Sequence, residues 1–256
     1  MVTERAKLRD PAAPRALRIV VVVLILLLVE LFVGIGWISP LFVSRPSAVA
    51  KTFIEMVAGR ELWQITGITL FTVLVTFLSG TFLGLPMGYL LWRYPFLGSA
   101  CENLLGSIFS SPLILLYPVF LVIFGRTLMA VIAQAFLVGI IPIILNTQSG
   151  LRQVSQTFID VGLTLHLTRW QLFRYVLLPA AAPTIFTGLR MGFIYMLLSI
   201  IAMEFVVALG GVGNLVSGAY FRLDTEELYV GVTLVIFFSV LFFRLLLHGQ
   251  KLVGPV

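Results

Sequence analysis

The chain has 256 residues, of which 60% are hydrophobic and 11% are charged, and its formal net charge is +6. Soluble domains average about 45–50% apolar and about 25% charged residues, so this composition excludes an ordinary soluble domain and predicts an integral membrane protein. The single cysteine, Cys101, excludes an intramolecular disulfide and a cysteine-based metal site.

Six apolar stretches are long enough to cross a bilayer, whose hydrocarbon core requires about 20 helical residues. They are residues 19–38, 68–92, 104–124, 128–145, 185–209 and 228–247. Their length predicts an all-α polytopic membrane protein with six transmembrane helices, because a β-barrel would show alternating segments of about ten residues. We expect one membrane domain over residues 19–247, between an N-terminal segment of residues 1–18 and a tail of residues 248–256.

Basic residues flank these stretches mostly on one side. With the N-terminus inside, the inner side receives Arg5, Lys7, Arg9, Arg15, Arg18, Arg93, Arg152, Arg169, Arg174, Arg190, Arg244 and Lys251. The outer side receives Arg45, Lys51, Arg60, Arg126 and Arg222, together with Asp224, Glu226 and Glu227. Because cytoplasmic loops are enriched in Lys and Arg, both termini are predicted to be cytoplasmic. The positive charge thus reflects topology in lipid, and no nucleic-acid partner is expected.

The first stretch carries one carboxylate, Glu30. We expect this stretch to be an uncleaved anchor, because it is too long for a signal peptide and no small-x-small cleavage site follows. An acid within a span is a functional hypothesis; the alternative is that Glu30, near an interface, reaches water or a neighbouring helix.

Residues 39–66 are predicted to lie outside and to contain a short amphipathic helix that begins at Pro46. Its apolar face is expected to hold Val49, Phe53 and Ile54, and its polar face Lys51 and Glu55. Such a helix can lie along the outer surface of the membrane.

The second stretch contains three glycines at intervals of four residues, Gly80, Gly84 and Gly88. Small residues at this spacing form a groove along one face of a helix, where another backbone can approach closely. This helix is therefore predicted to be buried against a neighbour.

The third stretch is interrupted by Ser110-Ser111-Pro112 and by Pro118. Each interior proline removes a backbone hydrogen bond, so this helix is predicted to be kinked or broken. Broken helices at membrane depth often line a pathway, which makes Ser110, Ser111 and Tyr117 candidates for lining one.

Polar residues of the fourth and fifth stretches extend this set of pathway candidates. Gln134 is the deep polar residue of the fourth stretch, and Tyr195 and Ser199 offer neutral hydrogen bonding in the fifth. Arg190 and Glu204 are fourteen residues apart, which places them on one helix face about 21 Å apart. Two roles remain open for this pair: lining or gating a pathway, or structural pairing between helices.

Glycines at positions 210, 211 and 213 follow the fifth stretch and predict a flexible outer turn. The last stretch is uniformly apolar until Arg244 and is expected to serve as scaffold.

The chain lacks the usual signatures of catalysis. No lysine follows a glycine, so the phosphate-binding loop G-x4-G-K-[ST] is absent and the chain has no ATP site of that kind. The two histidines, His166 and His248, are far apart, with no H-E-x-x-H metal motif and no G-x-S-x-G nucleophile elbow. We therefore expect neither an enzyme nor a cofactor or metal bound by this chain.

The cytoplasmic loop of residues 148–183 has the pattern of a helix, a turn and a second helix. Ser155 can cap the first helix, whose apolar residues Phe158, Ile159, Leu163 and Leu165 would share a broad face. Thr168 and Gln171 have the spacing of a capping box at the start of the second helix. Pro179 is expected to end that helix, and Pro183 to occupy the first turn of the fifth span.

This loop resembles the coupling segment of ABC importer permeases, whose pattern is E-A-A-x3-G-x9-I-x-L-P. The matching positions here are Asp160-Val161-Gly162, His166, Val176, Leu178 and Pro179. The nitrate, sulfonate and taurine branch of that family is similar at further segments: 45–49, 169–173, 178–181, 187–190 and 202–205. Two positions depart from the pattern. Gly162 replaces an alanine, and His166 stands where the family glycine ends the first helix at positive φ. His tolerates that conformation better than most residues, so two alternatives stay open: the turn keeps positive φ, or the loop turns differently.

The resemblance implies a type I ABC importer permease fold and a multi-pass protein of the bacterial plasma membrane. It implies partner ATPase subunits that carry ATP and Mg, a second permease subunit in a homodimer or heterodimer, and an external substrate-binding protein. The residues that it implies for ATPase coupling are Phe158, Asp160, Val161, Gly162, His166, Arg169 and Arg174.

Two other functions remain as alternatives. A secondary transporter or channel driven by an ion gradient predicts ionisable residues at the bilayer centre and often repeated halves. A scaffold subunit would only anchor partners. The substrate stays open between small anions, such as nitrate, sulfonates and aromatic acids, and vitamin-like heterocycles.

Overall fold

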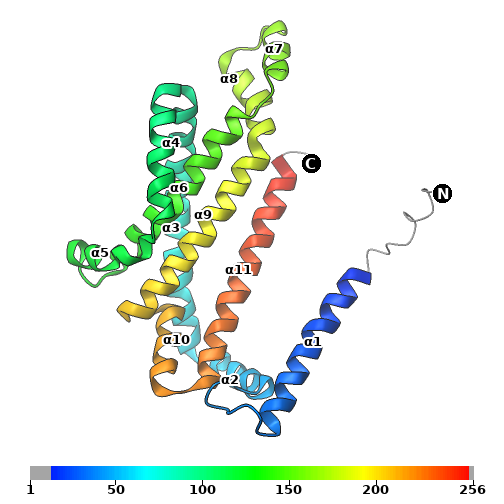
Figure 1. Cartoon of the computed structure of the whole chain (residues 1–256), viewed down its shortest axis with the longest axis vertical. Helices are drawn as coiled ribbons and strands as arrows, with labels where there is room; N and C mark the ends of the chain where they lie inside the picture. The colour runs from blue at the N-terminus through cyan, green and yellow to red at the C-terminus, as the bar shows by residue number, and fades with distance from the viewer. Residues whose placement is uncertain (1–12, 254–256) are drawn as a thin grey trace, which may run out of the picture.

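The computed structural model describes residues 13–253, and within that range every regular element is a helix (Figure 1). Residues 1–12 and 254–256, which include most of the predicted N-terminal segment and the end of the tail, lie outside the described residues. The elements are α1 (Ala13–Gly34), α2 (Pro46–Ala58), α3 (Arg60–Arg93), α4 (Pro95–Ser110), the 3-10 turn η1 (Leu113–Leu116), α5 (Tyr117–Phe124), α6 (Leu128–Arg152), α7 (Gln156–Thr164), α8 (Arg169–Leu172), the π turn η2 (Phe173–Leu177), α9 (Leu178–Val207), α10 (Gly211–Arg222) and α11 (Thr225–Val253).

Four helical segments in the described part of the chain are long and apolar enough to cross a membrane. They are Arg60–Arg93, Leu128–Arg152, Arg169–Val207 and Thr225–Gln250, and they correspond to the predicted second, fourth, fifth and sixth stretches, although the fifth stretch was predicted to end at residue 209. The third stretch falls in a helix pair bent by 83°, and the apolar part of α1, Ile19–Gly34, is shorter than the others. The described residues thus hold four candidate spans, or five with the bent pair; six spans with cytoplasmic termini remain a prediction.

Helices α3, α6 and α9 pack into the central core, and the glycine face of α3 explains why they can approach so closely. Gly80, Gly84 and Gly88 are buried. A Cβ atom at Gly84 would lie 2.8 Å from Cγ2 of Ile143 on α6, and one at Gly80 would lie 2.3 Å from Cε of Met196 on α9. The predicted groove is therefore confirmed, and it receives side chains from both neighbouring helices.

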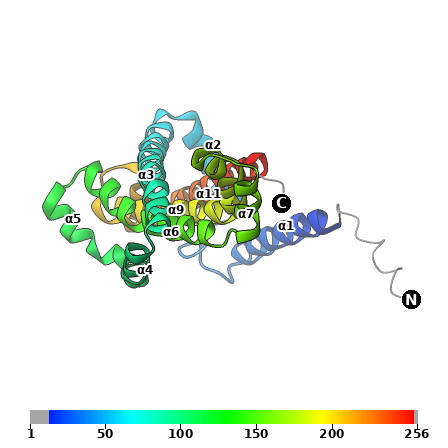
Figure 2. The same cartoon turned by 90° about the horizontal axis from the view of Figure 1, so that it is seen from above.

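Helix α4 breaks where the prolines predicted it. Ser111 is extended, with ψ 150°, and η1 and α5 follow at the 83° bend, so that α5 projects sideways from the bundle (Figures 1 and 2). Pro118 lies in the first turn of α5 and does not interrupt it, because a proline in that turn has no hydrogen bond to lose.

Helix α1 leans away from the bundle, on the side opposite α5 (Figure 2). Glu30 contacts the start of α2: its carboxylate accepts the backbone N–H of Ser47 at 3.0 Å and the hydroxyl of Ser47 at 2.7 Å. Free N–H groups at a helix N-terminus favour an anionic partner. The structure therefore agrees with the reading in which Glu30 reaches a neighbouring helix.

Helix α2 is amphipathic, as predicted, with one correction. Val49 and Phe53 pack against the cluster of Leu62, Val212 and Leu215, and Lys51 lies 3.9 Å from Glu55 on the other face. Ile54 is 67% exposed, so its predicted place on the apolar face is wrong. Five helical steps rotate it about 140° away from Val49, too far to share that face.

The glycine cluster after α9 is not the flexible turn that the sequence predicts. The chain reverses at Ala208 and Gly210, which have φ of 54° and 98°, and Gly211 already begins α10. Val212 and Gly213 are buried. Their N–H groups donate to side chains of α3 and α9, which explains why the segment forms a packed helix.

Candidate functional site

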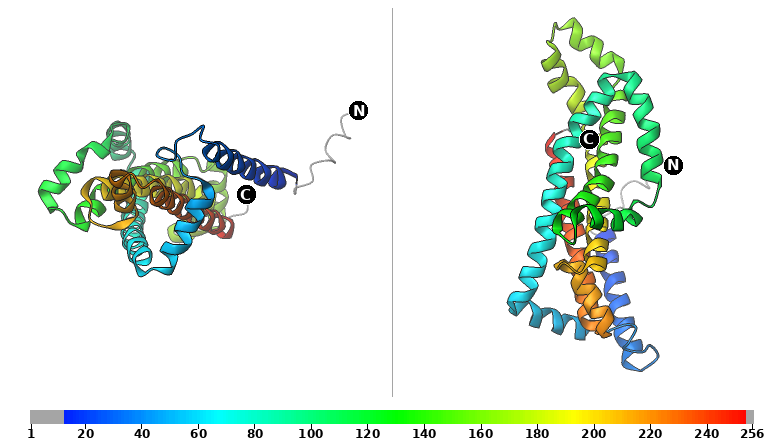
Figure 3. Two further views of the ribbon diagram at one scale, coloured as in Figure 1. Left: turned by 90° about the horizontal axis from the view of Figure 1, so that it is seen from below. Right: turned by 90° about the vertical axis from the view of Figure 1, so that its left-hand side faces the viewer.

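Residues 153–177, here called the arm, form a helical hairpin that projects beyond one end of the bundle (Figures 1 and 3). Its outgoing helix is α7, and its returning segments are α8 and η2. These continue into α9 as a single helical segment of 39 residues, Arg169–Val207. The predictions that Pro179 ends the second helix and that Pro183 occupies the first turn of the span are therefore wrong: Pro179 lies in the first turn of α9 and Pro183 lies inside the helix. The π turn η2 precedes Pro179, and such local adjustments let a helix pass a proline.

The turn of the arm is built around His166, whose φ is 55°. The N–H of His166 donates to the carbonyl of Leu163 at 2.9 Å, and that of Leu167 donates to the carbonyl of Gly162 at 3.1 Å. This pair of bonds is a Schellman motif, which usually requires glycine at the left-handed position. Of the two alternatives that the sequence left open at His166, the structure has the turn with positive φ.

Gly162 is the buried residue of the predicted coupling set. A Cβ atom there would lie 2.5 Å from Cδ1 of Leu172 on α8. Glycine in place of the family's alanine therefore allows a close contact between the two helices of the hairpin.

The two caps of the arm differ. Ser155 occupies the N-cap of α7, but its side chain makes no capping hydrogen bond. The predicted capping box of α8 is confirmed: the hydroxyl of Thr168 accepts the N–H of Gln171 at 3.3 Å, and the amide oxygen of Gln171 accepts the N–H of Thr168 at 2.8 Å.

The remaining predicted coupling residues are exposed on the arm: Phe158, Asp160, Val161, His166, Arg169 and Arg174. The apolar residues of α7 do not share one buried face, because only Ile159 packs against the core while Leu163 and Leu165 are 55% and 68% exposed. The tip of the arm thus presents Phe158, Val161 and Leu165 beside charged side chains. Contiguous exposed apolar surface of this kind is typical of a binding surface.

An aromatic contact joins the returning side of the arm to α3. The ring of Phe173 packs edge-on against Tyr89 with centroids 5.2 Å apart and stacks on Trp170 at 5.8 Å. Arg169 and Trp170 also line a cavity of about 530 Å³ with Leu85 and Pro86 of α3. The arm is therefore seated on the bundle through α3 as well as through α9.

Three of the predicted pathway residues meet at one cavity, of about 400 Å³, beside the break of α4. Ser111 comes from the break, and Tyr195 and Ser199 come from α9. Tyr195 packs edge-on against Phe109 of α4, with centroids 4.8 Å apart. The hydroxyl of Ser199 is buried and has no hydrogen-bond partner in the part of the chain that the structure describes. No charged side chain lines this cavity among the described residues, so it offers hydroxyl groups and aromatic edges.

The other neutral candidates stay outside the cavity lining. The hydroxyl of Ser110 donates back to the carbonyl of Gly106 at 2.9 Å, and Tyr117 packs against the core. Gln134 is fully buried, and its Nε2 donates to the carbonyl of Ile114 in η1 at 3.0 Å. Gln134 thus holds the broken segment in place.

Arg190 and Glu204 contact different helices, because α9 passes different neighbours along its length. The guanidinium of Arg190 lies 5.8 Å from the ring centroid of Phe243 on α11. Glu204 is fully buried and accepts the hydroxyl of Thr69 at 2.9 Å and the N–H of Gly213 at 3.0 Å. For Glu204 the structure agrees with structural pairing between helices.

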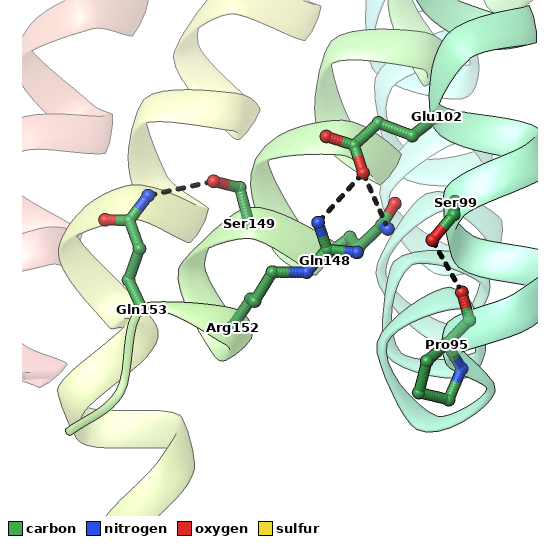
Figure 4. Close-up of polar contacts among 7 residues, drawn as sticks. All are labelled: Pro95, Ser99, Glu102, Gln148, Ser149, Arg152 and Gln153. Atoms are coloured by element: carbon green, nitrogen blue, oxygen red, sulfur yellow. Dashed lines mark hydrogen bonds and ion pairs between the residues drawn. The ribbon is translucent and has the colours of Figure 1, made fainter. Parts of the chain in front are cut away.

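A polar cluster at the root of the arm was not predicted from the sequence (Figure 4). Oε2 of Glu102 on α4 accepts Nη1–H of Arg152 at 3.0 Å and Nε2–H of Gln148 at 3.4 Å, both on α6 (Figure 4). The available signal was a lone carboxylate beside an apolar stretch, close to the predicted inner side where Arg152 lies. Its partner could not be identified, because the two residues are 50 positions apart.

Comparisons with known proteins agree with this geometry. A family model described as "Binding-protein-dependent transport system inner membrane component" matches residues 80–255. The riboflavin transport system permease protein RibX of Chloroflexus aurantiacus is 28% identical over 73% of this chain and 70% of its own length. The nitrate import permease protein NrtB of a Synechocystis species is 30% identical over 72% of this chain and 66% of its own length.

The taurine transport system permease protein TauC of Escherichia coli is 26% identical over 77% of this chain and 74% of its own length. Among solved structures, an inward-facing form of the MetNI methionine ABC transporter has a chain with a TM-score of 0.62 and 23% identity. The match covers 77% of this chain and 95% of that one, and it shows a shared fold.

Proposed function

The chain belongs to the binding-protein-dependent transport system inner membrane component family and is a permease subunit of an ABC importer for a small solute; from this premise we propose that residues 155–179 couple it to separate ATPase subunits. Those ATPases carry the ATP and Mg. A second permease subunit completes the pathway, and an external binding protein delivers the solute. The chain lies in the bacterial plasma membrane with six spans, the type I arrangement and both termini in the cytoplasm.

The observation that carries the coupling role is the exposed tip of the arm. Phe158 and Val161 are 58% and 54% exposed at the far end of a hairpin that leaves the bundle. An amphipathic helix that presents such residues is suited to a groove on a partner protein. The carboxylate of Asp160, which accepts Nε2–H of Gln156 at 3.0 Å, adds a charged contact on the same helix.

The arm can pass force into the bundle because its returning side has no loop before the membrane. Residues Arg169–Val207 form one helical segment, whose N-terminus is stiffened by the capping box. A movement of the tip therefore becomes a movement of α9. Transport then follows from a two-state equilibrium of the bundle that ATP binding and hydrolysis in the partner bias in turn.

The solute pathway is proposed to include the cavity that Ser111, Tyr195 and Ser199 line. The unpartnered hydroxyl of Ser199 supports this role, because buried polar groups normally have a partner and this one faces a space that a solute can enter. Recognition there would use neutral hydrogen bonds and aromatic edges.

The alternative of an ion-gradient transporter lacks support from the buried acid. Glu204 is the buried carboxylate of the described spans, and hydrogen bonds from Thr69 and Gly213 already satisfy it. An ion-coupling residue would instead face a pathway.

The coupling role is tested by Asp160→Lys in a complex of permease, ATPase and binding protein reconstituted in proteoliposomes. The solute is the one that is bound to the binding protein when that protein is purified. The expected result is normal assembly of the complex and loss of the ATP hydrolysis that the binding protein stimulates. Glu55→Lys, which makes the same change on an exposed residue of α2, is the matched control and should leave stimulation intact. Unchanged stimulated hydrolysis in Asp160→Lys would rule out the coupling role.

A further inference from the structure

We propose that Glu102 is a positioning residue that ties α4 to the root of the arm, so that movement of the arm also reaches the cavity at the break of α4. The inference rests on the proposed coupling role of the arm. It adds a second route into the bundle beside α9.

The partners of Glu102 lie at the end of α6, next to the arm. Arg152 is the last residue of α6, and α7 begins four residues later at Gln156. Gln148 lies one helical turn before Arg152, so both side chains point to Glu102 from the same face of α6 (Figure 4). A displacement of the arm therefore acts on the residues that hold Glu102.

Gln148 is held by its hydrogen bond to Glu102. Gln148 is 1% exposed, and its Oε1 has no hydrogen-bond partner within residues 13–253. Its Nε2 donates to Glu102, the one hydrogen bond of this amide among the described residues. Because a buried amide needs its partners, Gln148 holds the carboxylate in place as much as the carboxylate holds it.

Helix α4 packs on α6 along one face. Gly98 is the buried residue of α4, and a Cβ atom there would lie 3.0 Å from Nε2 of Gln148. Along the same face, Leu105 and Phe109 pack against a cluster that includes Ile141 and Ile144 of α6. Residues 98, 102, 105 and 109 repeat at intervals of three and four, so they form one continuous stripe.

The far end of this stripe, Phe109, lies at the cavity beside the break of α4. Phe109 packs edge-on against Tyr195, and both line the cavity with Ser111 and Ser199. Helix α4 is 16 residues long, or about 24 Å, and it ends at the 83° break. A shift applied at Glu102 is therefore carried by a rigid element to the aromatic contact at the cavity.

Stability alone does not account for this cluster. The side chains of Arg152 and Glu102 are 50% and 47% exposed, and exposed ion pairs add little to the free energy of folding. The role proposed here is therefore measured by coupling between residues and by transport, and not by thermal stability.

The test is a double-mutant cycle in the reconstituted complex of permease, ATPase and binding protein, with ATP hydrolysis and solute moved per ATP as readouts. The variants are Glu102→Gln, Arg152→Gln, the two combined, and the charge exchange Glu102→Arg with Arg152→Glu. We expect each single variant to assemble normally, to keep its basal hydrolysis and to lose stimulated hydrolysis by about 2- to 30-fold. The combined variant should lose no more than either single one, and the charge exchange should recover most of the activity.

The matched control is another exposed pair of one basic and one acidic residue, Lys51 and Glu55 on α2, changed to Lys51→Gln and Glu55→Gln. The inference is overturned if the Glu102 variants behave as these controls do, if the losses of the two single variants multiply, or if the charge exchange recovers nothing. In those cases a normally stimulated wild-type complex leaves the proposed function standing. A wild-type complex without stimulation would overturn the proposed function and this inference together.

Discussion

The hydroxyl of Thr69 donates to the carboxylate of Glu204 at 2.9 Å, although the two residues are 135 positions apart in the chain. The same hydroxyl accepts the N–H of Val212 at 2.8 Å, and Glu204 also accepts the N–H of Gly213. One buried group of hydrogen bonds thus joins α3, α9 and the first turn of α10. These hydrogen bonds pack the glycine-rich reversal of the chain against α3 and α9. We call Thr69, Glu204, Val212 and Gly213 the corner.

Thr69→Val tests this corner with almost no change in volume. It leaves the N–H of Val212 and one side of Glu204 without partners, which should lower the free energy of unfolding by about 1–3 kcal/mol. Thr72→Val on the same helix is the control, because among the described residues the Thr72 hydroxyl donates only to the carbonyl of Ile68, four residues earlier. Thermal unfolding of the purified protein in detergent measures both. An equal loss in the two variants would contradict the role of the corner.

Gly88→Ala should disrupt the packing of α3 on α6. The new Cβ would lie 2.6 Å from Cβ of Thr147 and 2.7 Å from the backbone oxygen of Ile144, so backbone must move. Overpacking of this kind costs about 1–3 kcal/mol. Gly67→Ala on the same helix meets nothing within 4 Å and should be neutral or stabilising, by up to about 1 kcal/mol. The difference is read from unfolding midpoints in detergent, and equal midpoints would argue against close packing at Gly88.

His166→Val should loosen the turn of the arm, because β-branched residues fit the left-handed conformation poorly. His166→Gly should keep the turn, since glycine adopts φ of 55° without strain. Cleavage of the arm by a protease added to the purified protein is expected to quicken several-fold for the valine variant only. Leu165→Val, at the neighbouring exposed position with φ −78°, controls for the side chain itself. Equal cleavage of the valine and glycine variants at residue 166 would show that the turn does not depend on φ.

Ser199→Ala is expected to separate stability from transport. Removing a buried hydroxyl that has no partner should leave the unfolding midpoint unchanged or raise it, whereas solute uptake by the reconstituted complex should fall. Ser217→Ala is the matched control, because the buried hydroxyl of Ser217 donates to the carbonyl of Asn214 at 3.1 Å and its loss should cost about 1 kcal/mol. A lowered midpoint with normal uptake in Ser199→Ala would remove Ser199 from the pathway.

Features that depend on neighbours in the chain were predictable from the sequence. The apolar stretches mark the long helices, since hydrophobic length is a local property. The proline at 112 marks the break of α4, and the spacing of Thr168 and Gln171 marks a capping box, because both act within a few residues. At His166 the local pattern left two alternatives, a turn with positive φ or a different turn, and the structure has positive φ.

Features that depend on contacts across the chain were decided only by the tertiary structure. The sequence showed Glu204 as a charge in a span but not its partners on α3 and α10, and it gave no reason to join Glu102 to Arg152. It placed Ile54 on the wrong face and ended a helix at Pro179 that the π turn allows to continue. A local pattern states what a residue can do. Which residue it contacts depends on helices that come together from distant parts of the chain. Such contacts give Glu204 its hydrogen-bond partners on α3 and α10, and they pack the arm against the bundle.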